Sequence, residues 1–197
     1  MSTALTLLGI GWVVAAAVMA LLWLLRPRRG DTAIRDAAWA AVVGSLAVLY
    51  AWRAEHGSLG RRVAIASMMG SWGARRAVHL LYDRRFGAAN TGSAMSASWW
   101  SFQAYALAAA CCSIPAAIAA VNPAPDFSRF EYVAAVMWAI GFAGASTADR
   151  QLLAFRSDPE NEGQPCRVGV WRLLRHPTET FEAVMWTAFA LFASASL

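Results

Sequence analysis

Long apolar segments separated by short polar connectors constrain this fold more than any other feature of the sequence. A helix of about 20 mostly apolar residues spans the hydrocarbon core of a bilayer, which is about 30 Å thick. Six segments meet or approach this length, over residues 3–25, 36–52, 63–82, 99–121, 130–147 (continuing as a polar turn to 155) and 178–197. We therefore predict an all-α, polytopic transmembrane bundle of about six helices, forming a single integral membrane domain over residues 1–197.

Composition agrees with a membrane protein. Charged residues make up 15% of the chain, against about 25% in soluble domains. Local signals refine the segments: Pro27 and Gly30 should end the first helix, Asp36 should cap the second, and Pro115 should kink the fourth. Trp99 and Trp100 are typical of an interfacial anchor at a helix start.

The basic residues predict orientation. All 17 of them are arginine, and the first, third and fifth connectors hold eleven. Because arginine-rich connectors face the cytoplasm, we expect both termini outside and the loop 149–178 in the cytoplasm, with the bacterial inner membrane as the location. The arginines are spread over connectors rather than one soluble face, which argues against nucleic acid as a partner.

Cysteine usage and ligand spacing indicate neither a disulfide framework nor a metal site. Cys111 and Cys112 lie within an apolar run, and Cys166 stands alone in the polar loop, which suggests small apolar fillers. His176 has no neighbouring metal ligands in the sequence, so we expect no metal.

The third apolar segment carries charge where the bilayer would make it costly. Arg75 and His79 are four residues apart and share one helix face, whereas Arg76 lies about 100° round the helix. A guanidinium at lipid depth either faces a cavity or extends to the interface, and the sequence leaves both readings open.

The longest polar interval, Asp149–Glu182, indicates an anion site. It holds one histidine, Trp171 and five arginines, namely Arg150, Arg156, Arg167, Arg172 and Arg175. Arginine presents a planar fork of donors suited to phosphate, and a tryptophan can stack on a flat ring. Arg172 and Arg175 would face one anion if the segment were helical, and His176 before Pro177 should break the chain ahead of the last helix. The alternative is that these arginines only determine topology.

This interval carries a motif, ADxQLxxFRxDPxNxGxxCxxGxWRxxRHP, with a glutamate six residues after its histidine. The motif, together with GDTAIRDAAWA at 30–40 and WGARRAVHLL at 72–81, resembles bacterial relatives of the steroid 5-alpha-reductases. The WRxxRHP core alone also resembles isoprenylcysteine and phospholipid methyltransferases.

The resemblance implies a membrane enzyme that passes hydride from NADPH to a carbon–carbon double bond conjugated to a ketone in a lipophilic substrate. It implies that Asp149 and Arg156 hold the cofactor and that the surrounding loop wraps it. Arg75 and Glu182 would face the same cavity. The loop residues that match are Trp171, Arg172, Arg175 and His176; Arg167 is included in the expected site only because it belongs to the arginine cluster. The matching positions name no catalytic acid.

Departures from the family pattern keep two alternatives open. This chain reads RHPTETFE where the family usually reads RHPNYFGE, so Thr178, Glu179 and Phe181 are changed. The sequence also ends after the sixth segment, where relatives continue. The alternatives are a membrane methyltransferase that uses S-adenosylmethionine, and a diverged, non-catalytic protein that binds lipid or a partner helix.

Overall fold

The computed structural model describes residues 2–25, 32–85 and 98–195, which are helical and contain no strand. The α-helices are α1 (Ser2–Leu25), α2 (Thr32–Arg53), α3 (Leu59–Arg85), α4 (Trp99–Cys112), α5 (Ile114–Val121), α6 (Arg129–Arg156) and α7 (Pro177–Ser194). Two short 3-10 helices, η2 (Pro159–Asn161) and η3 (Gly169–Arg172), lie between α6 and α7. The all-α helical bundle predicted from the sequence is confirmed.

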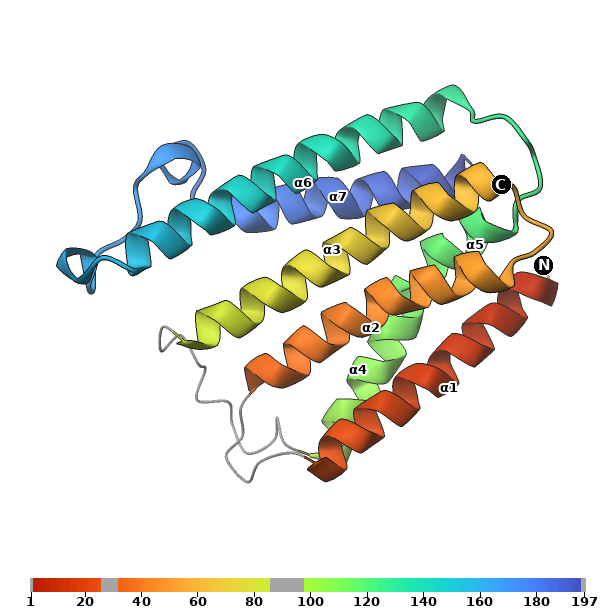
Figure 1. Cartoon of the computed structure of the whole chain (residues 1–197), viewed down its shortest axis with the longest axis horizontal. Coiled ribbons are helices and arrows are strands. Elements are labelled where there is room, and N and C mark those ends of the chain that lie inside the picture. Colours follow the sequence, from red (N-terminus) through yellow and green to blue (C-terminus); the bar gives the residue numbers. More distant parts are fainter. Residues whose placement is uncertain (1, 26–31, 86–97, 196–197) are drawn as a thin grey trace.

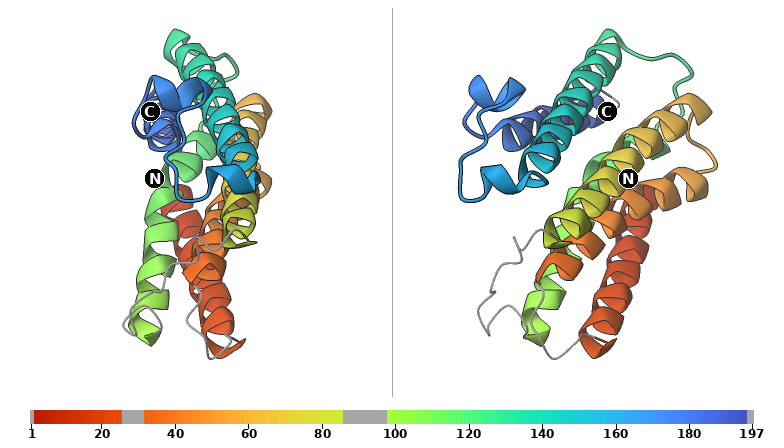
Figure 2. Two further views of the ribbon diagram at one scale, coloured as in Figure 1. Left: turned by 90° about the vertical axis from the view of Figure 1, so that its left-hand side faces the viewer. Right: turned by 60° about the vertical axis from the view of Figure 1, so that its left-hand side comes forward.

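The helices run alternately up and down, and α4 and α5 together make one span (Figure 1). Helices α2 and α3 pack as one pair and α6 and α7 as another, while α1 packs on α4. Helix α3 lies between α2 and the α6–α7 pair (Figure 2). Both chain ends lie at one end of the bundle, and the loop between α6 and α7 lies at the other (Figure 1).

Among the described residues, three spans are long and apolar enough by length and composition to cross a membrane: 3–25, 33–53 and 99–121. These support a membrane protein. The remaining long helices, α3 and α6, reach about 40 Å each at 1.5 Å per residue. Helix α3 is longer than the sequence predicted, whereas α6 includes the predicted polar extension to residue 155. Both carry buried ionisable side chains, which lower their hydropathy without shortening them.

The break within the fourth span is confirmed. Helix α4 ends at Cys112, and Pro115 sits in the first turn of α5, where its missing N–H costs no hydrogen bond. Ser113 lies at the junction, and its hydroxyl is 3.1 Å from the Tyr50 hydroxyl of α2.

The predicted cap at Asp36 is wrong. Helix α2 already includes Thr32, so Asp36 lies within the helix and its carboxylate accepts from Arg35 at 3.4 Å. Pro27 and Gly30, expected to end the first helix, lie outside the described residues.

Two arginines counted as connector residues are buried. The Arg35 guanidinium donates to the Tyr105 hydroxyl and lies 4.3 Å from the centre of its ring. Arg61, at the start of α3, makes a two-pronged ion pair with Glu131 of α6, at 2.6 and 2.9 Å, and also donates to two carbonyls of the 122–128 connector. Glu131 closes a capping box with Ser128. Arg61 therefore anchors the start of α6 instead of marking only topology.

Helices α2 and α3 approach closely where two glycines meet. A Cβ at Gly73 would lie 2.6 Å from the Ala40 carbonyl oxygen and 3.0 Å from the Gly44 Cα. These are backbone atoms and cannot swing aside, so the interface depends on the missing side chain.

We predict that Gly73→Ala lowers the stability of the detergent-solubilised protein by about 1–3 kcal/mol, because the added methyl forces the two helices apart. Gly9→Ala is the matched control, since a Cβ at Gly9 has no neighbour within 4 Å. Thermal unfolding followed by circular dichroism checks this. Equal melting temperatures for the two variants would contradict the close approach.

Candidate functional site

A buried triad of charges joins three helices. Arg75 of α3 donates to Asp149 of α6 through one terminal nitrogen, and through the other to Glu182 of α7 at 2.6 Å. Both carboxylates and the guanidinium are at most 15% exposed. The Trp72 indole also donates to Glu182, at 3.3 Å. Arg75 therefore turns inward and does not extend to the interface.

A chain of polar contacts leads from this triad towards the end of α6. His79, one turn beyond Arg75 on α3, places its Nε2 3.5 Å from Asp149 and 3.3 Å from Asp83. Asp83 in turn pairs with Arg156 at 2.9 Å. The predicted shared face of Arg75 and His79 is confirmed, because both contact Asp149.

The charges of this cluster balance. Its cations are the guanidinium groups of Arg75, Arg76 and Arg156, and its anions are the carboxylates of Asp83, Asp149 and Glu182. Arg76 completes the set, 3.7 Å from Glu182. Within this cluster of described residues, two buried atoms have no hydrogen-bond partner, Nε of Arg75 and Nδ1 of His79. Because unpaired polar atoms are costly inside a protein, these two mark places where a ligand atom or a water would be stabilised.

The loop after α6 folds back onto that helix. The Trp171 indole donates to the Ala148 carbonyl at 3.0 Å, and the Val170 amide donates to the Gln151 side chain at 2.9 Å. Gly169 has φ +55°, which permits this turn without strain. Trp171 thus lies beside α6 about two turns before the helix ends.

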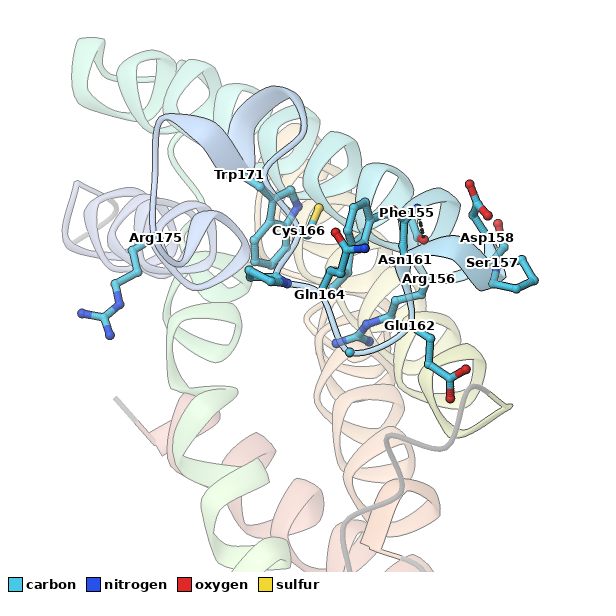
Figure 3. A pocket seen from close by; sticks show the side chains of 14 residues that line it. Phe155, Arg156, Ser157, Asp158, Asn161, Glu162, Gln164, Cys166, Trp171 and Arg175 are labelled. Carbon is cyan, nitrogen blue, oxygen red and sulfur yellow. Dashed lines mark hydrogen bonds between the residues drawn. The ribbon is translucent and has the colours of Figure 1, made fainter.

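A pocket of about 730 Å³ lies between the folded loop and the last turns of α6 (Figure 3). This volume is in the range of small-molecule sites. Its lining includes two aromatic rings, two arginines and two carboxylates, from Phe155, Trp171, Arg156, Arg175, Asp158 and Glu162. The Arg175 guanidinium points away from the other labelled side chains (Figure 3).

The nine residues predicted from the sequence fall into three groups. Three are joined in the buried triad: Arg75, Asp149 and Glu182. Three line the loop pocket: Arg156, Trp171 and Arg175. Three are exposed and outside that lining: Arg167, Arg172 and His176. Residues 169–172 form a 3-10 turn and Leu173–His176 lie outside any helix, so the helical segment on which Arg172 and Arg175 would share one anion does not form.

Sequence reasoning missed Asp83 as a partner. It lies four residues after His79, and this spacing was the available signal. The residues that differ from the family pattern, Thr178, Glu179 and Phe181, are all placed by the structure. A Cβ at Gly144 of α6 would meet the Phe181 ring at 2.4–2.6 Å, so the ring packs directly over this glycine. Thr178 donates to Asp149 at 3.2 Å. Glu179 is 78% exposed and lies beside His176.

We predict that Asp149→Ala destabilises the protein by about 3 kcal/mol or more, because Arg75 and His79 lose a buried anionic partner. Glu179→Ala is the control: its contact with His176 is exposed, and exposed pairs contribute about 0–1 kcal/mol. Denaturation in detergent measures both. Similar losses for the two variants would show that Asp149 is not a buried partner.

Comparison with known proteins places the chain in a family without assigning an activity. No curated protein and no solved structure shows significant similarity to it. A family model described as "Protein of unknown function (DUF1295)" matches residues 22–197, which include every helix from α2 to α7. That family is related to steroid 5-alpha-reductase-like proteins. The chain belongs to the DUF1295 family.

Proposed function

We propose that this protein is a membrane-embedded reductase that uses NADPH to reduce a carbon–carbon double bond conjugated to a ketone in a lipophilic substrate. One observation carries the proposal: a continuous chain of polar contacts joins the loop pocket to the interior of the bundle. It runs from Arg156 through Asp83 and His79 to Asp149 and the triad. Ionisable residues among membrane helices are costly and commonly functional.

The residues of the loop pocket fit a dinucleotide. Arg156 supplies a fork of donors for phosphate, and Trp171 is anchored at its indole nitrogen, which leaves the ring to stack on a flat heterocycle. The carboxylates of Asp158 and Glu162 suit ribose hydroxyls as acceptors. When bound, NADPH would supply the hydride. The chain's own residues would bind and orient it, while Arg75, Asp149 and Glu182 hold paired charges inside the bundle.

The proposed orientation places this pocket in the cytoplasm, where reduced nicotinamide is available. The loop lies at the end of the bundle where α1 and α3 finish and α4 begins (Figure 1), the end to which the sequence assigns most arginines. Arginine remains more frequent in the connectors at this end of the bundle when the buried Arg35 and Arg61 are left out of the counts for the two sides of the membrane. We propose the bacterial inner membrane, with both chain ends outside and membrane lipid around the helices.

A methyltransferase that uses S-adenosylmethionine is the second candidate. The specific observation in its favour is the acidic part of the pocket lining, Asp158 and Glu162, because that cofactor carries positive charge. The same carboxylates would accept from the ribose hydroxyls of either cofactor but would repel the phosphates of a dinucleotide.

We predict that NADPH quenches the tryptophan fluorescence of the purified protein and that Arg156→Ala weakens its binding about tenfold or more. A hydrogen bond to a charged group contributes about 1.5–3 kcal/mol, and 1.4 kcal/mol corresponds to a factor of ten. Arg150→Ala is the control. Arg150 is exposed on the same helix and lies outside the pocket lining, and its side chain donates to the Ser146 carbonyl one turn earlier in α6.

Three outcomes distinguish the candidates. Binding of NADPH that weakens in Arg156→Ala and not in Arg150→Ala supports the reductase. Binding of S-adenosylmethionine alone supports the methyltransferase. If neither cofactor changes the fluorescence at saturating concentration, both enzymatic candidates are overturned and a non-catalytic role is favoured. Turnover is then tested by NADPH oxidation with lipophilic enones.

A further inference from the structure

The outer face of the folded loop combines exposed apolar and cationic side chains. Leu173 is 84% exposed and Val168 is 51% exposed. Three exposed arginines stand among them, namely Arg167, Arg172 and Arg175. A single exposed leucine is ordinary on a soluble surface, so the position of this face relative to the bilayer decides its meaning.

The position of this face relative to the bilayer follows from helix α6. Its exposed apolar side chains begin at Phe130 and include Val136 and Ile140. From Phe130 to Thr147 the helix rises about 26 Å at 1.5 Å per residue, close to the thickness of a hydrocarbon core of about 30 Å. A hydrocarbon core that begins at Phe130 would therefore end near Thr147, and the exposed Arg150 would be in the headgroup region.

The loop returns to this level of the helix. Trp171 bonds to Ala148, and Val170 bonds to Gln151, so η3 lies beside the turn of α6 that leaves the hydrocarbon. A loop that projected from the helix end at Arg156 would stand about 12 Å further from the bilayer, given the eight residues from Ala148 to Arg156. The folded loop instead lies along the membrane surface.

We propose that the outer face of this loop docks on anionic phospholipid headgroups, with Leu173 and Val168 immersed at the interface and Arg167 and Arg172 bound to lipid phosphates. Apolar side chains interspersed with cations are the chemistry that binds anionic bilayer surfaces. Basic residues near such a surface are attracted to its anionic headgroups. The docking does not depend on the proposed function, because Arg167 and Arg172 lie outside the pocket lining.

Spin labels at two positions of the full-length protein test the docking. Leu173→Cys carries a label on the outer face, and Glu162→Cys carries the control label on the pocket side. Both are made in a background where Cys111, Cys112 and Cys166 are alanine. In nanodiscs with phosphatidylglycerol, we expect oxygen to relax the label at 173 preferentially and a water-soluble nickel chelate to relax the label at 162. Equal access of the nickel chelate to both labels would overturn the proposal.

A second experiment varies the charge of the lipid and the two arginines of the outer face. We expect the label at 173 to become more accessible to the nickel chelate in phosphatidylcholine alone, and Arg167→Gln/Arg172→Gln in phosphatidylglycerol to behave in the same way. No change in either comparison would overturn the role of anionic headgroups. If the same double variant weakened NADPH binding more than tenfold in detergent, its arginines would serve the cofactor, and the lipid assignment would be wrong.

Discussion

The buried ion triad of Arg75, Asp149 and Glu182 is the interaction on which this structure depends. Helices α6 and α7 pack on each other along most of their length but touch α3 at only a few points. The triad lies at that junction, with one residue from each of the three helices. In a medium of low polarity, an unpaired guanidinium would be costly by several kcal/mol. The need to keep Arg75 paired therefore fixes how the α6–α7 pair sits on the rest of the bundle.

A second buried pair repeats this arrangement at the opposite end of the same helices. Arg61 and Glu131 join the start of α3 to the start of α6, so α3 is tied to α6 at two levels by charge. Lipid chains are as apolar as leucine and provide little drive for helix association. Directional polar contacts and close packing over glycine, as at Gly144 under Phe181, hold the helices together here. The triad thus has a structural role whether or not the loop pocket binds a cofactor.

The sequence predicted the helices better than their partners. Apolar length predicted where the helices lie, and Pro115 and Pro177 marked the breaks, because both signals act locally along the chain. The partner of Arg75 did not follow, since it depends on which helix faces α3 across the bundle. Arg35 and Arg61 were counted as connector arginines for the same reason: their burial against Tyr105 and Glu131 is set by tertiary contacts.

The candidate site was predicted in part. Family likeness and the density of arginines pointed to an interval in which the structure has a pocket, and Trp171 and Arg156 line that pocket. The division of that interval into an inner, pocket-lining side and an outer, exposed side was not predictable. It depends on Gly169 turning the chain back along α6, and spacing alone places Arg172 and Arg175 together on a helix that does not form.

A double-mutant cycle between Arg75 and Asp149 tests the central claim most directly. The free energy of unfolding is measured for the native protein, for Arg75→Leu, for Asp149→Leu and for the double variant. Residues in direct contact within one network show coupling of about 0.5–3 kcal/mol; for this buried pair we expect a value towards the upper end, with the double variant more stable than either single variant. Additive losses, with coupling below about 0.3 kcal/mol, would show that the two charges do not meet inside the bundle.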